Sequence, residues 1–196
     1  APPPSIAELP AILAGQQLVE YYVSETQTLA LTYTQADGLA VTDLPGPEVW
    51  RPILQAYRQQ LTSPNTAIDP SLPYRLYRAL IAPLPLHAES NIVLIPDGDL
   101  YMLPFGALLT DTPTTDATLS AWPWFTKTAE LNYAFSVQLL DRSRRQSHRG
   151  NGRVLAVAPV ARIENTEKIA PRLELPATLR TVRQIAQLLP TDTLIN

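Results

Sequence analysis

The stretch "NIVLIPDGDLYMLPFGALL" (residues 91–109) decides how this chain is expected to fold. Its apolar run at residues 92–95 does not alternate with polar residues, which is typical of a strand buried on both faces of a sheet. Pro96-Asp97-Gly98 follows at once, and Pro and Gly supply the backbone angles that a tight turn requires. The stretch therefore predicts a central strand, followed by a turn that carries two acids, Asp97 and Asp99.

Further buried strands and helices are expected after this turn. Residues 131–146 are predicted to form a short strand that passes through Ser136, a helix cap, into a helix. Three more elements are expected: a strand at 153–160, a helix at 175–189 and the start of a strand at 192–196. Buried strands that alternate with helices indicate a parallel α/β sheet.

Different elements are expected before it. Residues 16–44 alternate between apolar and polar and are rich in Val, Thr and Tyr, so we interpret them as a three-stranded antiparallel meander, either a separate layer or an extension of the sheet edge. Amphipathic helices are predicted at 47–61 and 73–84. The apolar face of the first contains Val49, Trp50, Ile53, Leu54, Tyr57 and Leu61.

The expected domain organisation starts with a linker and a short helix in residues 1–15. Ser5 and Glu8 have the spacing of a capping box, and Pro10 is expected to interrupt that helix. The rest, 16–196, divides into the meander at 16–44, a helical segment at 47–85 and an α/β core at 91–196.

The composition excludes several classes of function. The chain has 196 residues, a formal net charge of −3, no cysteine and only two histidines. Disulfides, cysteine-ligated metals, a cysteine nucleophile within the chain and a histidine-rich metal site are thereby excluded. We expect no nucleic-acid partner, no membrane span, no metal and no cofactor. The N-terminus lacks signal-peptide features and does not begin with Met, so we expect an excised or processed piece.

Asp97 and Asp99 are the first candidates for chemistry. An Asp-x-Asp pair after a buried strand can hold Mg²⁺ and attack a phosphoryl group, as in phosphatases of the haloacid-dehalogenase type. Here, however, Gly98 stands between the two acids, where that motif places glycine after them. We therefore favour a structural turn over a catalytic loop.

The two histidines and the glycines offer little more. His87 and His148 lie in or beside loops, and no Gly-x-Ser-x-Gly elbow supplies a serine for either to activate, so both are interpreted as exposed loop residues. The glycines do not form a phosphate-binding motif, and 149–152 is interpreted as a plain loop.

Two clusters have both a functional and a structural interpretation. The basic residues Arg142, Arg144, Arg145 and Arg149 can meet an acidic partner or nucleic acid. Cations are also favoured at helix C-termini, which is the interpretation we prefer. The aromatic residues of 121–125 and 74–78 can stack on a ligand, but core packing is favoured.

The order of the segments carries a resemblance to a known family. Pro96-Asp97-Gly98, then Leu103-Pro104-Phe105 and Ala107-Leu108, are followed by "LNYAFSVQLL", "VLAVAPV" and "LPATLRTVRQIAQLL". With "LYRALIAPL" and residues 18–38 before them, these segments resemble a CHAT domain, a family named for caspase-HetF association with tetratricopeptide repeats.

The resemblance implies a caspase-like α/β fold with a mainly parallel sheet, whose C-terminal part is not in this chain. Active members use a His–Cys dyad, in which the thiolate attacks a peptide carbonyl. Neither His87 nor His148 matches the family's catalytic position, so the resemblance assigns no catalytic, cofactor-binding or metal-binding residue. Pro96-Asp97-Gly98 corresponds to a structural turn.

Two functions follow from the resemblance. One is the N-terminal scaffold portion of a bacterial, cytoplasmic cysteine peptidase domain, inactive alone because the dyad lies beyond residue 196. The other is a non-catalytic interaction module. Expected partners are the remaining part of the domain, a helical-repeat region upstream and a protein or peptide substrate. An unpaired sheet edge after residue 195 is expected to recruit a second chain or to cause self-association.

Overall fold

The computed structural model describes residues 4–63, 67–87, 91–114, 117–145, 154–158, 181, 183–185, 187 and 191–195. The chain divides into two compact units, Ala1–Arg145 and Gln146–Asn196. Each unit is described by itself. None of the described helices is both long and apolar enough to cross a membrane.

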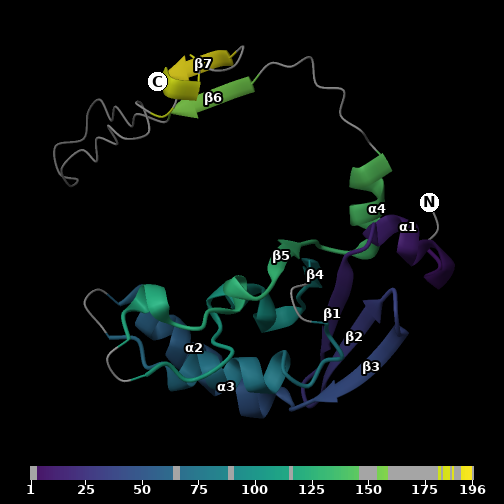
Figure 1. Cartoon of the computed structure of the whole chain (residues 1–196), viewed down its shortest axis with the longest axis vertical. Helices are drawn as coiled ribbons and strands as arrows, with labels where there is room; N and C mark the ends of the chain where they lie inside the picture. Colours follow the sequence, from purple (N-terminus) through teal and green to yellow (C-terminus); the bar gives the residue numbers. More distant parts are fainter. Residues whose placement is uncertain are drawn as a thin grey trace. The chain divides into compact units, whose positions relative to one another are not determined.

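The first unit is built on a five-stranded mixed sheet with the order β3-β2-β1-β4-β5 (Figure 1). The strands are β1 (Gln17–Val23), β2 (Thr28–Thr34), β3 (Gly38–Leu44), β4 (Asn91–Ile95) and β5 (Glu130–Tyr133). Strands β1, β2 and β3 pair antiparallel, whereas β4 pairs parallel with both β1 and β5. The meander therefore extends the edge of the same sheet, and the sheet is mixed where the sequence suggested a mainly parallel one.

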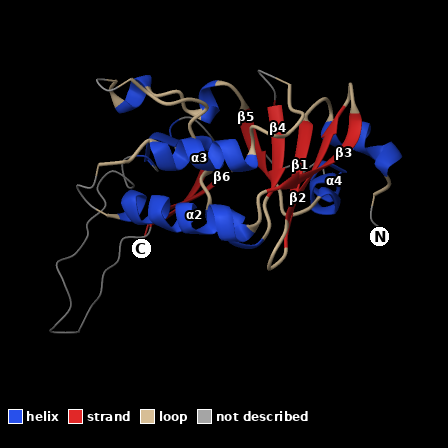
Figure 2. Cartoon of the chain, turned by 90° about the horizontal axis from the view of Figure 1, so that it is seen from below, coloured by secondary structure: helices blue, strands red, loops and turns tan. Residues whose placement is uncertain are grey.

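Both faces of β4 are buried, as the apolar run at 92–95 predicts. Val19, Ile92 and Leu94 pack on one face against the helices α2 (Pro47–Thr62) and α3 (Ser71–Leu80), which lie side by side (Figure 2). Leu18 and Val93 pack on the other face, against α1 (Leu9–Leu13) and α4 (Val137–Arg145). The unit thus has a helix layer on each side of β1 and β4.

Helix α2 closely matches its sequence prediction. Pro47 occupies its first turn, where a missing N–H costs nothing, and Trp50, Ile53, Leu54 and Tyr57 are buried. Val49 and Leu61 do not belong to that buried face, because 49% and 42% of their surfaces are exposed. Their inclusion in the apolar face was therefore wrong.

The N-terminal helix differs from its prediction at one proline. Ser5 and Glu8 form the expected capping box at the 3₁₀ helix η1 (Ile6–Glu8). Pro10 does not interrupt α1, because it lies in the first turn of that helix, where no N–H is needed. At α4, Ser136 Oγ accepts a hydrogen bond from Leu139 N at 3.1 Å, as its predicted role of cap requires.

The segment between β4 and β5 folds as a series of short 3₁₀ helices. They are η2 (Gly98–Met102), η3 (Phe105–Ala107), η4 (Leu119–Ala121) and η5 (Phe125–Lys127). Their apolar residues Leu100, Phe105 and Leu108 are fully buried under the same face as α2 and α3.

The second unit contains β6 (Val154–Ala158) and β7 (Thr191–Ile195), which pair parallel. Both confirm strands expected from the sequence. Of the helix expected at 175–189, the described residues 181, 183–185 and 187 are helical.

Candidate functional site

The carboxyl ends of β1, β4 and β5 lie at one edge of the sheet, because these three strands are mutually parallel. This edge is where α/β proteins most often place binding and catalytic groups. The candidate residues of the sequence analysis that fall at this edge are Asp97 and Asp99, in the turn after β4.

Both carboxylate oxygens of Asp97 accept hydrogen bonds from backbone amides. Its Oδ1 accepts a hydrogen bond from Gly98 N at 2.9 Å, and its Oδ2 accepts one from Val23 N at 2.8 Å. Gly98 adopts a φ of 53°, in the left-handed region that favours glycine. Asp97 therefore caps η2 and connects the ends of β1 and β4, which confirms a structural turn.

Asp99 points to a different partner. Its Oδ2 lies 2.5 Å from Arg51 Nε, and both side chains are partly exposed, at 54% and 39%. The Arg51 guanidinium also lies 5.6 Å from the ring centroid of Trp50. Among the described residues there is no group of three or more metal-ligating side chains, so the geometry does not support the Mg²⁺ site considered for Asp97 and Asp99.

Exposed aromatic side chains gather at the same edge. The rings of Tyr101 and Phe135 have centroids 6.4 Å apart, and these residues are 50% and 76% exposed. Tyr133 lies 6.5 Å from the buried Phe105. Burial raises the pKa of the Tyr133 hydroxyl, partly offset by hydrogen bonds from the backbone of Phe105 and Gly106. This cluster was not predicted from the sequence. It could have been expected from the aromatic residues that lie close to the ends of two predicted parallel strands.

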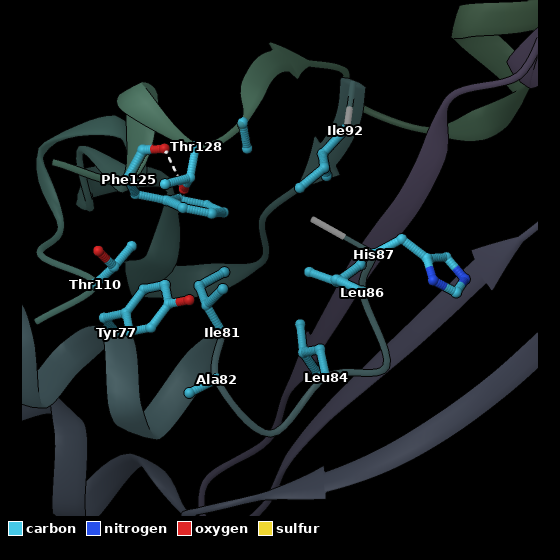
Figure 3. Close-up of a pocket in the computed structure, with 11 residues that line it drawn as sticks. Tyr77, Ile81, Ala82, Leu84, Leu86, His87, Ile92, Thr110, Phe125 and Thr128 are labelled. Atoms are coloured by element: carbon cyan, nitrogen blue, oxygen red, sulfur yellow. Dashed lines mark hydrogen bonds between the residues drawn. The ribbon is translucent and has the colours of Figure 1, made fainter. Parts of the chain in front are cut away.

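A cavity of about 320 Å³ lies elsewhere, between the end of α3, the start of β4 and η5 (Figure 3). Its lining is mostly apolar, with Ile81, Ile92 and Phe125 prominent. The hydroxyls of Thr110 and Thr128 already donate to the carbonyls of Pro123 and Phe125, at 3.2 and 3.0 Å. Since Ile92 is the second residue of β4, this cavity lies at the amino end of the strand, away from the carboxyl edge.

His87 borders that cavity, but its ring points away from it (Figure 3). Its Nε2 lies 2.8 Å from Asp37 Oδ2, and its backbone exchanges hydrogen bonds with the side chain of Gln17. His87 is thus an exposed loop residue at the amino end of β1, as expected. His148 and residues 149–152 lie outside the described residues.

The basic cluster is partly engaged within the chain. Arg145 Nε lies 2.6 Å from Asp141 Oδ1, and its guanidinium also faces Glu8 at 3.7 Å. Arg144 donates to Ile12 O and Gln16 Oε1. These contacts attach the C-terminus of α4 to α1, which agrees with the structural interpretation. Arg142 is exposed, and Arg149 lies outside the described residues.

Of the aromatic residues in 74–78 and 121–125, Trp122 and Phe125 are buried, and Tyr74, Tyr77 and Trp124 are half-buried. Tyr77 and Phe125 meet edge to face with centroids 5.5 Å apart. Trp122 is 8% exposed and its Nε1 donates to Ala117 O at 3.1 Å. Burial agrees with core packing for Trp122 and Phe125, whereas Tyr77 also lines the cavity beside α3.

Comparison with known protein families finds a match to the CHAT domain over residues 72–195. The match includes most of α3, the Asp97 turn, β5, α4 and both strands of the second unit. Comparison with curated proteins gives no match. Because the matched residues make up more than half of the chain, this protein belongs to the CHAT domain family.

Proposed function

We propose that this chain is the scaffold portion of a caspase-like cysteine peptidase domain and has no peptidase activity by itself. One observation carries the proposal: a chain that belongs to the CHAT family contains no cysteine in its 196 residues. The thiolate that attacks the peptide carbonyl must then come from polypeptide outside this chain.

His87, the histidine that the structure describes, is not placed to act as a general base at the carboxyl edge. His87 lies at the amino end of β1, where its side chain faces Asp37 and its backbone is bound to Gln17. A general base for a nucleophile at the carboxyl edge must come within hydrogen-bond reach of that nucleophile. The contribution of this chain is therefore to position strands, and Asp97 does so by connecting β1 to the turn after β4.

We extend the proposal to the setting of the protein. The partners are the remaining part of the same domain, a helical-repeat region and a protein or peptide substrate, in a bacterial cytoplasm. The support for this setting is the family resemblance, together with the exposed aromatic cluster of Tyr101 and Phe135, which offers an apolar surface at the carboxyl edge.

The test is a peptidase assay with and without the missing groups. The pure 196-residue chain is incubated with a fluorescent casein and a mixed peptide library, and no turnover above buffer is expected. Co-expression with the remaining polypeptide of the domain should give cleavage that a thiol alkylator abolishes. Peptidase activity of the pure chain would refute the proposal.

A non-catalytic interaction module is the second candidate. It is compatible with the intramolecular partners of Asp97 and Asp99, which engage both carboxylates in structural contacts. The parent reading frame separates the two: a histidine-bearing strand followed by a cysteine-bearing strand supports the peptidase, and their absence supports the module.

A further inference from the structure

One face of the meander presents large apolar side chains that the described elements of the first unit do not fully cover. The strand register places Glu20, Leu31 and Val41 in one row across β1, β2 and β3, and Tyr22, Leu29 and Asp43 in a second. A third row contains Leu18, Tyr33 and Leu39. These nine residues are called the meander face below.

Two residues of the meander face, both in its third row, are well buried. Leu18 and Tyr33 pack against α1, and they are 0% and 8% exposed. The rest of the meander face is more open. Val41 is 62% exposed and Tyr22 61%, and Leu39, at the β3 end of the third row, is 37% exposed. In Figure 1, α1 and α4 lie together near one end of β1.

The opposite face of β2, the central strand of the meander, is fully covered. On that face β2 carries the small side chains of Thr28, Ala30 and Thr32, which are 0%, 0% and 1% exposed. Thr28 and Ala30 lie on the face that α2 covers. Strand β2 thus directs small residues to the covered face and leucines to the more open one, and open apolar surface of this kind commonly marks an interaction site.

The two charged residues of the meander face, Glu20 and Asp43, are both acidic. Glu20 stands in the central row, and among the described residues its carboxylate has no hydrogen-bond or ion-pair partner. Partial burial raises the pKa of Glu20, because the charged form loses solvent. Asp43 adds a second acid, and the three strands contain no Lys, Arg or His.

We propose that the meander face binds an amphipathic helix of a partner protein, with apolar side chains on Leu31 and Val41 and an Arg or Lys against Glu20. A helix is the usual cover for the apolar face of a sheet, and α1 already packs in this way on the third row. A cationic residue gives Glu20 the partner that it lacks.

A second copy of this chain fits the meander face less well. Two copies packed face to face would bring Glu20 and Asp43 close to the same acids of the other copy, and like charges so placed are unfavourable. The charge therefore favours a cationic helix. The surface does not require the peptidase function, because none of its residues lies in the Asp97 turn.

The experiment uses the full chain and a pair of designed helical peptides. Each is about 18 residues long, roughly five turns, with a leucine stripe; one carries a central Arg on that stripe and the other a Glu. Fluorescence anisotropy should show that the Arg peptide binds at least about tenfold more tightly than the Glu peptide.

Variants of the full chain locate the binding. Val41→Asp and Val41→Ser should each weaken binding of the Arg peptide by about tenfold, and Glu20→Gln should remove most of the preference for Arg over Glu. Val49→Asp, which makes the same change at an exposed valine of α2 outside the meander face, is the matched control and should change nothing. Circular dichroism confirms that each variant is folded.

Three results would overturn the proposal. They are equal binding of the two peptides, binding that Val41→Asp leaves unchanged, and self-association of the wild-type chain, seen by light scattering, that Val41→Asp abolishes. The last would assign the meander face to a second copy.

Discussion

At the scale of single residues, the two acids that flank Gly98 differ in what they bind. Asp97 accepts hydrogen bonds from the backbone of Gly98 and of Val23, whereas Asp99 forms a partly exposed ion pair with Arg51. Backbone amides bound to a carboxylate contribute more to stability than an exposed ion pair does. The two residues should therefore differ clearly when each is replaced.

Asp97→Ala should lower the free energy of unfolding by about 1–3 kcal/mol, because two amides lose a charged acceptor. Asp97→Asn keeps one acceptor oxygen and should lose less. Asp99→Asn should cost under about 1 kcal/mol, since it removes only an exposed ion pair. Urea denaturation of the three variants measures these differences, and an equal loss for Asp97→Ala and Asp99→Asn would contradict the assignment.

Glu20 gives a pH-dependent prediction. Burial raises the pKa of Glu20 in the folded chain, because the charged carboxylate loses solvent. The folded state is therefore not penalised while Glu20 is protonated, below its pKa in the unfolded chain. It loses stability as the pH rises through the folded-state pKa and the carboxylate ionises. Glu20→Gln should therefore raise the melting temperature at pH 7 and change it little at pH 4 relative to wild type. Calorimetry at both pH values tests this; Glu25→Gln, in the adjoining turn, is the control.

The sequence predicts the Asp97 turn because its determinants are local. Pro96 and Gly98 set backbone angles within three residues of one another. The contact of Asp97 with Val23 spans 74 positions, and no local pattern contains it. The pair of Tyr101 and Phe135 was missed for the same reason, since it exists only because β4 and β5 are parallel neighbours.

At the scale of elements, α2 is attached to the meander by one buried polar contact. Trp50 Nε1 donates to Thr28 Oγ1 at 2.9 Å, and both residues are fully buried. A buried indole N–H without a partner loses its hydration with no compensation. The contact therefore fixes where α2 lies along β2 as well as adding stability.

Thr28→Val should cost about 1–3 kcal/mol of unfolding free energy, because it leaves the Trp50 N–H unpaired at nearly constant volume. Thr28→Ser retains the hydroxyl and should cost less. In a Trp50→Phe background, the additional cost of Thr28→Val should fall sharply, since no donor remains. Additive losses in this double-mutant cycle would show that the hydrogen bond contributes nothing.

Element types could be predicted from the sequence more fully than their burial. Alternation in 16–44 identifies β1, β2 and β3, and the apolar run at 92–95 identifies β4. Alternation cannot show which face a helix will cover, and Val41 lies on the more open face. Likewise the apolar pattern of α2 included Val49 and Leu61, which the neighbouring elements do not reach.

At the scale of the whole molecule, the first unit has a hydrophobic core of its own. Both apolar clusters described for the chain lie within Ala1–Arg145. A compact unit with its own core can fold independently, so we expect residues 1–145 to be stable as a fragment.

A fragment of residues 1–145 should unfold cooperatively on heating and retain the near-ultraviolet dichroism of its buried Trp50 and Trp122, because both described apolar clusters lie within it. Circular dichroism of this fragment, with the full chain as reference, measures this. A 1–145 fragment without a melting transition would contradict the division.

The parallel pairing of Gln17 with Ile92 also bears on how the protein is made. A ribosome delivers the meander long before it delivers β4, so β1 leaves the exit tunnel with one hydrogen-bonding edge vacant until some 75 further residues have been added. Contacts so distant along the chain form slowly and leave nascent strands open to wrong pairing. Translation speed through the codons of residues 45–95 should consequently affect the yield of native protein, and chaperones that shield extended segments should matter most within that interval.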